Sequence, residues 1–203
     1  MNVIQELKDR RIIPVAVLEN KADTERVLGG LVGGGLPVAE ITYRTAYAEQ
    51  AIADASEMFP DMLIGVGTIL SGAQCACAIK AGAKFIVSPG LSEEVSFMCM
   101  QKKVPYFPGA VTPTEIMKAI TLGHTVVKFF PASIYGGMRA IKALSAAFGQ
   151  ISFIPTGGVD ESNLKEFLAF NKIFAVGGSF MTMGSAEEIA ERTRKIVAIC
   201  ERD

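Results

Sequence analysis

The chain has 203 residues, of which half are apolar and 20% are charged, and its formal net charge is −1. This length and composition predict one globular domain, residues 1–203, and the near-neutral charge gives no sign of a basic surface, so no nucleic-acid partner is expected. No run of about eighteen apolar residues predicts a membrane span, and the N-terminus lacks the pattern of a signal peptide. The cytoplasm is therefore the expected location.

Short apolar runs recur along the chain, and a helical stretch follows each of them. After a short N-terminal helix they are "IIPVAVLE" (12–19), "PVAEITYR" (37–44), "LIGVGTI" (63–69), "FIVSPG" (85–90), "PYFPGA" (105–110), "TVVKFFP" (125–131), "SFIPTGG" (152–158) and "FAVGGS" (174–179). Eight strands that alternate with helices predict a parallel sheet, and eight such units close most economically into a (β/α)₈ TIM barrel.

Helix signals lie between the runs. Thr112, Pro113 and Glu115 form a capping box with proline at the first helical position, and Ser185 and Glu188 repeat the box. The glycine-rich stretch 29–35 is expected to form a cap and a turn at a helix end. An open doubly wound sheet is the alternative fold, but the nucleotide-binding glycine motifs typical of it are missing.

A lysine interrupts the sixth apolar run. Alternation places Lys128 on the same strand face as Val126 and Phe130, which points into the barrel if the other face packs under helices. An amine among apolar neighbours loses its charge readily and can attack a carbonyl to form a Schiff base. The alternative is a structural lysine that is paired with Glu40, and the residue type alone does not decide between the two.

Polar residues also alternate along the second run. Glu40, Thr42 and Arg44 share one face, which is hard to explain by packing if that face lines a barrel. Glu40 suits general acid–base catalysis, and the Arg44 guanidinium suits a carboxylate or a phosphate. The alternative is an edge strand with these residues in solvent, but a closed barrel has no edge.

The last two predicted strands end in glycine pairs, at the place where many barrels bind phosphate. Backbone N–H groups of Gly157, Gly158, Gly178 and Ser179 are candidates to hold an anion, and ordinary turns are the alternative.

Metal and serine-hydrolase chemistry are not expected, because His124 is the only histidine and it lies at the start of its strand. Of the four cysteines, Cys75 and Cys77 are two residues apart on a predicted helix, and such residues point about 200° apart. The cysteines are therefore expected to be structural thiols. Lysine covalent catalysis needs neither a metal nor another cofactor.

The set "EITYRT", "GVGTIL", "FIVSPG", "VKFFPAS", "PTGGV" and "GGSF" resembles the class I 2-keto-3-deoxy-6-phosphogluconate (KDPG) aldolases, some of which also act on 2-keto-4-hydroxyglutarate (KHG). The resemblance runs from about residue 12 to residue 182. It implies a cytoplasmic homotrimer that needs no metal and cleaves a phosphorylated 2-keto-3-deoxy sugar acid.

The resemblance also implies a role for each motif residue. Lys128 forms the Schiff base and Glu40 is the general acid–base. The expected substrate-binding residues are Arg44 and Thr68 for the pyruvate carboxylate, Pro89, Phe130 and Thr156 for the pocket wall, and Gly157, Gly158 and Ser179 for the phosphate.

The sequence departs from the family pattern at two places. Leu18 and Glu19 stand where some members carry an arginine, and Phe180 stands where a tryptophan is common. The related phosphogalactonate aldolases usually lack the residues that are Arg44, Thr45 and Thr156 here, which favours the gluconate series. A barrel isomerase or epimerase acting on a sugar phosphate, and a non-enzymatic phosphometabolite-binding protein, remain as alternatives from other functional classes.

Overall fold

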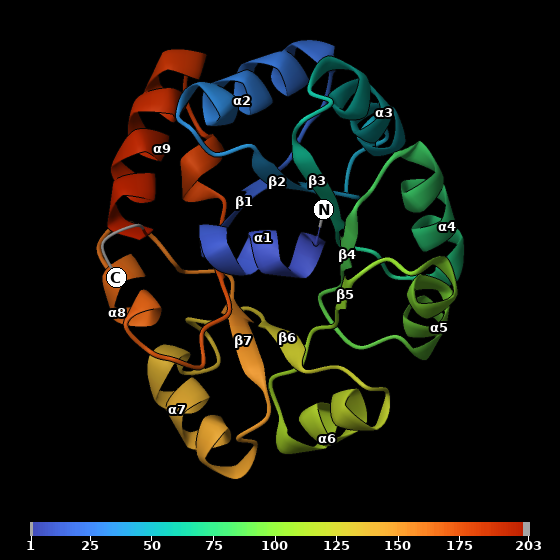
Figure 1. The fold of residues 1–203 in the computed structure, drawn as a ribbon, viewed down its shortest axis with the longest axis vertical. Helices are drawn as coiled ribbons and strands as arrows, with labels where there is room; N and C mark the ends of the chain where they lie inside the picture. The colour runs from blue at the N-terminus through green and yellow to red at the C-terminus, as the bar shows by residue number, and fades with distance from the viewer. Residues whose placement is uncertain (1, 201–203) are drawn as a thin grey trace.

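The computed structural model describes residues 2–200 as eight strands and nine α-helices in regular alternation (Figure 1). The strands are β1 Ile12–Ala16, β2 Val38–Thr42, β3 Leu63–Gly67, β4 Phe85–Val87, β5 Tyr106–Phe107, β6 Val126–Phe129, β7 Ser152–Pro155 and β8 Val176–Gly178. The helices are α1 Val3–Arg10, α2 Lys21–Gly33, α3 Ala48–Met58, α4 Gly72–Ala81, α5 Glu93–Lys102, α6 Pro113–Thr121, α7 Gly137–Ala147, α8 Leu164–Leu168 and α9 Ala186–Cys200, with a 3₁₀ turn, η1, at Phe180–Thr182. Within residues 2–200, no helix is both long enough and apolar enough to cross a bilayer.

The strands close into a parallel barrel. Six of them pair in the order β5-β4-β3-β2-β1-β8, and β6 pairs with β7. Backbone hydrogen bonds join the two groups: Lys128 N donates to Pro108 O at 2.8 Å, and Phe174 N donates to Phe153 O at 2.9 Å. Isolated bridges at Gly109–Lys128 and Thr156–Gly177 complete the two seams. The predicted (β/α)₈ barrel is thus confirmed, and the open-sheet alternative is wrong.

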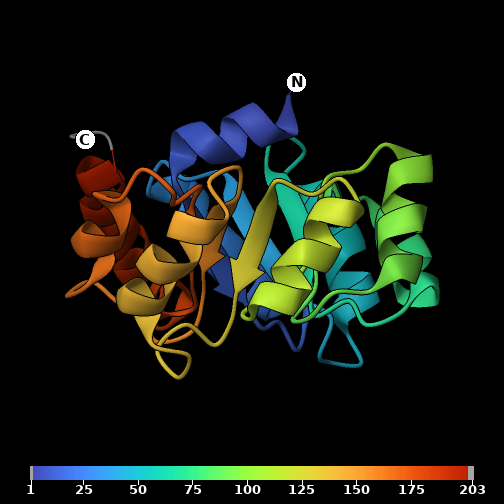
Figure 2. The ribbon, with the colours of Figure 1, turned by 90° about the horizontal axis from the view of Figure 1, so that it is seen from below.

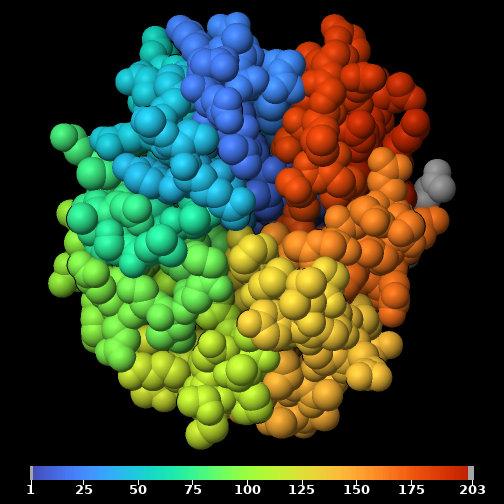
Figure 3. All heavy atoms as spheres, turned by 180° about the vertical axis from the view of Figure 1, so that it is seen from behind, coloured from blue at the N-terminus to red at the C-terminus, as the bar shows by residue number. Residues whose placement is uncertain are grey.

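Helix α1 lies across the end of the barrel where the strands begin (Figures 1 and 2). Its Leu7 is fully buried, and the Arg11 guanidinium after the helix donates to the backbone carbonyl of Leu168. The loops that follow the strands lie at the other end, where segments from all parts of the chain meet (Figure 3). A catalytic site is therefore expected at that second end.

The glycine-rich stretch 29–35 packs two helices together. Gly30 and Gly34 face α9 so closely that a Cβ on Gly30 would lie 2.7 Å from Ile189 Cγ2, and one on Gly34 would lie 2.4 Å from Thr193 Cβ. The expected cap and turn holds for Gly34 and Gly35, which end α2. It is wrong for the earlier glycines, which lie inside α2 and let α9 approach it.

The predicted capping boxes are confirmed. Thr112 Oγ1 accepts from Glu115 N at 3.4 Å, and Glu115 Oε2 accepts from Thr112 N at 2.9 Å. Ser185 and Glu188 exchange the same pair of bonds at the start of α9. These bonds satisfy N–H groups that have no partner inside the helix, so the helices begin where the sequence predicts.

Candidate active site

A buried ion pair joins opposite sides of the barrel. Lys128 on β6 and Glu40 on β2 are only 4% and 2% exposed, and Lys128 Nζ donates to Glu40 Oε1 at 2.9 Å. Removing two charges from water is costly, and a pair inside a barrel is no more stable than apolar residues of the same size. The structure thus contains the Lys128–Glu40 pair that the sequence offered as the alternative to catalysis. The same pair also places a proton acceptor beside the amine.

The ring of Phe130 lies over this pair. Lys128 Nζ is 5.5 Å from the ring centroid, a distance at which the ring face attracts a cation. Phe130 follows β6 directly and is half-buried, so it covers the amine from the end of the barrel that carries the loops.

The amine opens into a cavity of about 180 Å³. Its lining brings together most of the residues that the sequence predicted, from five different loops and strands. They are Arg44, Lys128, Phe130, Thr156, Gly157, Gly158, Gly178 and Ser179, joined by Val15, Val17 and Val159. Strand ends far apart in the sequence thus meet at the end of the barrel that Figure 3 shows from outside.

Arg44 lines one side of the cavity, and the predicted Thr68 contacts Arg44 without lining the cavity itself. Arg44 Nε donates to Thr68 Oγ1 at 3.0 Å, which joins the loop after β2 to the loop after β3. Thr68 has a left-handed backbone, with φ of +61°, an unusual conformation for a β-branched residue. The bond leaves the terminal nitrogens of the Arg44 guanidinium available for an anion.

The two glycines after β7 have positive φ angles, +87° at Gly157 and +77° at Gly158. A Cβ on Gly157 would lie 3.3 Å from the Phe130 ring, and one on Gly158 would lie 2.3 Å from Ser133 Oγ. Only glycine fits such a turn, which brings the backbone to the wall of the cavity. Ser179 follows β8 on the same wall and is exposed, so backbone N–H groups here can hold an anion.

One predicted pocket residue lies in a neighbouring hollow. Pro89 lines a depression of about 260 Å³ with Gly109, Tyr135 and other residues, and Phe130 is the wall that this depression shares with the amine's cavity. Pro89 is therefore near the Lys128 cavity without lining it.

Two lining residues were missed, Val15 on β1 and Val17, which follows that strand. The sequence drew attention to Leu18 and Glu19, but Leu18 is buried and it is Val17 that lines the cavity. Alternation along β1 could have shown this, because Val15 and Val17 share a face. Thr45, which favoured the gluconate series, donates to the Leu18 carbonyl at 2.7 Å and so fixes the loop.

The other noted departure, Phe180, fills space beside the last strand. Its ring lies against Gly178, where an added Cβ would be 2.5 Å from Phe180 Cε1. Phe180 is thus a packing residue next to the glycine wall and does not itself line the cavity.

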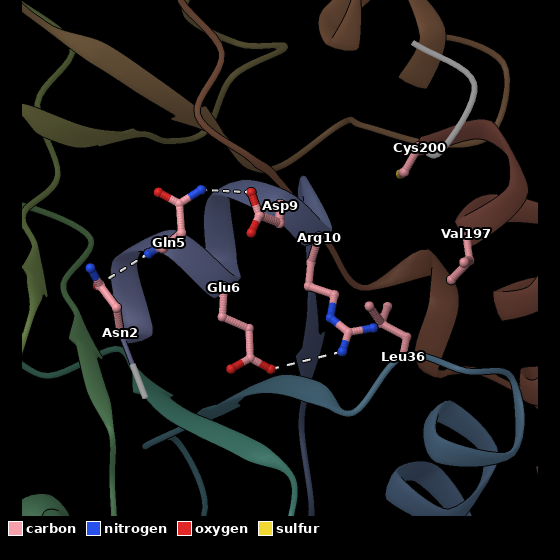
Figure 4. A pocket seen from close by; sticks show the side chains of 8 residues that line it. All are labelled: Asn2, Gln5, Glu6, Asp9, Arg10, Leu36, Val197 and Cys200. Carbon is pink, nitrogen blue, oxygen red and sulfur yellow. Dashed lines mark hydrogen bonds and ion pairs between the residues drawn. The ribbon is translucent and has the colours of Figure 1, made fainter.

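A larger hollow lies at the opposite end of the barrel, beside α1 (Figure 4). It measures about 490 Å³ and is lined mainly by α1, with Leu36, Val197 and Cys200 on its other side. Its polar side chains satisfy one another: Gln5 Nε2 donates to Asp9 Oδ1 at 2.7 Å, and Arg10 lies 3.8 Å from Glu6. It contains no buried charged pair, so the smaller cavity at Lys128 is the better candidate for catalysis.

No group of three or more histidine, cysteine, aspartate or glutamate residues that could hold a metal is found between residues 2 and 200. His124 lies away from Lys128, at the start of β6, and its Nε2 is 2.7 Å from Ser96 Oγ. Cys75 and Cys99 are free, buried thiols whose sulfurs are 3.5 Å apart between α4 and α5. The groups that the site itself offers for chemistry are the Lys128 amine, the Glu40 carboxylate and the walls that could hold an anion.

Comparison with known proteins gives consistent results. A family model described as "KDPG and KHG aldolase" matches residues 3–198. The 2-dehydro-3-deoxy-phosphogluconate aldolase of Pseudomonas aeruginosa is 41% identical over 174 residues, which cover 86% of this chain and 79% of that protein.

Solved structures are similar over the whole barrel. The 2-keto-3-deoxy-6-phosphogluconate aldolase of Zymomonas mobilis ZM4, with 3-phosphoglycerate, is 31% identical with a TM-score of 0.92, over 98% of this chain and 96% of that one. A KDPG aldolase from Legionella pneumophila, with pyruvate captured at low pH as a covalent carbinolamine intermediate, is 32% identical with a TM-score of 0.86. The match covers 100% of this chain and 98% of that one.

Proposed function

This chain belongs to the KDPG and KHG aldolase family, and on that premise we propose that it is a Schiff-base aldolase that cleaves KDPG to pyruvate and glyceraldehyde 3-phosphate. The observation that carries the mechanism is the buried contact of 2.9 Å between Lys128 Nζ and Glu40 Oε1 at the floor of a cavity with anion-binding walls. The carbinolamine captured in the Legionella protein supports covalent chemistry in the family.

The reaction begins with a proton transfer. Lys128 must lose a proton before its nitrogen can attack the C2 ketone, and Glu40 is the acceptor within hydrogen-bond distance. Attack gives a carbinolamine. Glu40 then returns the proton to the C2 hydroxyl, water leaves, and the nitrogen lone pair forms the C=N bond of the Schiff base.

The same carboxylate serves the cleavage step, because it is anionic again once water has left. Glu40 takes the proton of the C4 hydroxyl, the C3–C4 bond breaks, and its electron pair moves into the protonated imine. Glyceraldehyde 3-phosphate departs, and Glu40 passes its proton through water to C3 of the remaining enamine. Hydrolysis of the resulting imine then releases pyruvate and free Lys128.

Different walls of the cavity suit the two charged ends of the substrate. Arg44, held by Thr68, suits the carboxylate beside C2, and the glycine wall with Ser179 suits the phosphate at C6. Phe130 and Thr156 lie between these ends.

Cleavage of KHG to pyruvate and glyoxylate is a second activity that the lining favours. Arg44 and Lys128 are its only charged members among the described residues, so the glycine wall carries no cation committed to a phosphate dianion. No acidic side chain from the part of the chain that the structure describes lines the cavity either, so the terminal carboxylate of a shorter substrate is not repelled there.

Borohydride reduction with pyruvate tests the proposal. We expect one adduct by peptide mass spectrometry, on Lys128, and loss of activity in proportion to it. Lys128→Arg should be inactive and unlabelled, because a guanidinium does not form the imine. Exposed Lys84 and Lys142 are internal controls. An adduct on one of these, or active protein that borohydride does not trap, would contradict the Schiff base and favour an isomerase or epimerase with Glu40 as base.

The configuration of the substrate at C4 and the assembly of the protein are also proposed. Pyruvate release from KDPG is compared with pyruvate release from its C4 epimer, and the faster reaction assigns the protein to the gluconate or the galactonate series. A homotrimer is the expected assembly, and light scattering coupled to size-exclusion chromatography measures it.

A further inference from the structure

Two hydroxyl groups stand out for lacking partners. Among the side chains of residues 2–200, Thr42 Oγ1 and Thr193 Oγ1 are the buried polar atoms without any hydrogen bond. Both residues are 0% exposed. A buried hydroxyl without a partner lowers stability, whereas valine has nearly the same shape and no such cost, so packing alone does not explain a threonine.

Thr42 lies in the barrel beside the reactive pair. It is two residues after Glu40 on β2, so the two side chains share the face that points into the barrel. It pairs across the sheet with Gly67, which has no side chain to satisfy the hydroxyl. Arg44 follows two residues later in the turn after β2, so Thr42 lies between Glu40 and Arg44 along the chain.

Thr193 lies elsewhere, on the outer layer. It is on α9 and packs against Gly34 at the end of α2. The described residues therefore contain two buried threonine hydroxyls without a hydrogen bond, one in the barrel interior and one between two helices. The second copy provides a matched control for the first.

The proposed function leaves one substrate atom without a group that holds it in place. Arg44 is matched to the carboxylate, Glu40 to the protons of the reaction, and the glycine wall to the phosphate. The oxygen on C2 receives a proton from Glu40, but no second group orients it while the carbinolamine loses water. Because C2 is bonded directly to Lys128 Nζ in that intermediate, its oxygen lies next to the side chains of β2.

We propose that the Thr42 hydroxyl is a further catalytic residue that hydrogen-bonds the C2 oxygen of the carbinolamine between Lys128 and the 2-keto acid. The proposal rests on the Schiff-base function above. Thr42 keeps its own proton throughout: Glu40 protonates the C2 hydroxyl, the C2–O bond breaks as the C=N bond forms, and water leaves. The hydroxyl of Thr42 orients that oxygen on departure and the incoming water on return.

Oxygen exchange at C2 of pyruvate tests the step directly, since each cycle of imine formation and hydrolysis replaces that oxygen with one from solvent. The wild type, Thr42→Val, Thr42→Ser and Thr193→Val are incubated with pyruvate in ¹⁸O-water, and the spontaneous exchange is subtracted. We expect Thr42→Val to lower the catalysed exchange by about tenfold, the size of effect of one hydrogen bond, and Thr42→Ser to retain most of it. Thr193→Val should exchange as the wild type does.

Thermal unfolding supplies the second measurement. Both valine variants should be at least as stable as the wild type, because each loses an unpaired buried hydroxyl. Slower exchange without lost stability supports the proposal. Exchange by Thr42→Val at the wild-type rate overturns it, and so does a joint loss of exchange and stability that Thr42→Ser shares. A wild type that neither exchanges nor is trapped by borohydride overturns the proposed function itself, and this inference with it.

Discussion

The Glu40 carboxylate occupies the space that a side chain on Gly67 would fill. A Cβ on Gly67 would lie 1.9 Å from Glu40 Oε1, the same oxygen that accepts from Lys128. Strand β3 therefore leaves room for the Glu40 carboxylate on β2 by having no side chain at this point. The first prediction follows from that contact.

Gly67→Ala should displace the carboxylate and lower the rate of KDPG cleavage by about 10²-fold, as a displacement of about 1 Å of a catalytic group can do. Pyruvate release, measured by coupling to lactate dehydrogenase, gives the rate. Gly149→Ala is the control, because a Cβ there meets nothing within 4 Å. Full activity in Gly67→Ala would show that Glu40 tolerates another position.

Glu40→Gln should lower turnover by about 10²- to 10⁴-fold, the usual contribution of a positioned acid–base group. The amide keeps the size and can still accept from Lys128, but it cannot carry a proton. Trapping with pyruvate and borohydride should fall less, because trapping needs no C3–C4 cleavage and water can carry the proton. Turnover close to that of the wild type would remove Glu40 from the mechanism.

Ser179→Asp should place a negative charge against the substrate phosphate. Like charges in contact cost about 1 kcal/mol in water and several in a partly desolvated cleft, so kcat/KM on KDPG should fall at least about tenfold. Cleavage of KHG is measured on the same preparation and should change much less, because KHG has no phosphate. Equal losses on the two substrates would place the phosphate elsewhere and leave the glycine pairs as simple turns.

Stability should depend on pH through His124. Burial lowers the pKa of this imidazole below its ordinary value, and Ser96 Oγ is 2.7 Å from its Nε2. The folded chain then binds a proton less readily than the unfolded chain, so this contribution to stability is complete above about pH 6.5 and declines as the pH falls below it.

Urea unfolding at several values between pH 8 and pH 5.5 measures that decline. His124 is the only histidine, so few other groups titrate in this window. His124→Gln should flatten the dependence of the unfolding free energy on pH relative to the wild type. The same slope in both proteins would assign the dependence to other groups.

The fold could be predicted from the sequence because its determinants are local. Strand and helix periodicity, the capping box at Thr112 and the glycines at strand ends each act within a few residues, and their order implies a barrel. Alternation likewise predicted the faces of Lys128 and Glu40, and the strand ends predicted where anions could bind. The glycines of α2 show the limit: nothing within α2 indicates that α9, more than 150 residues later, packs against them.

The sequence by itself thus determined the barrel, the interior lysine and carboxylate, and most of the strand ends that line the cavity. Only the tertiary structure decided that Lys128 and Glu40, 88 residues apart, meet at 2.9 Å, that Val17 and not Leu18 faces the cavity, and that Pro89 lies behind Phe130. The same holds for the unpaired hydroxyl of Thr42. The physical reason is that side-chain direction depends on neighbours along one strand, whereas distances across a barrel depend on how all eight strands are staggered when it closes.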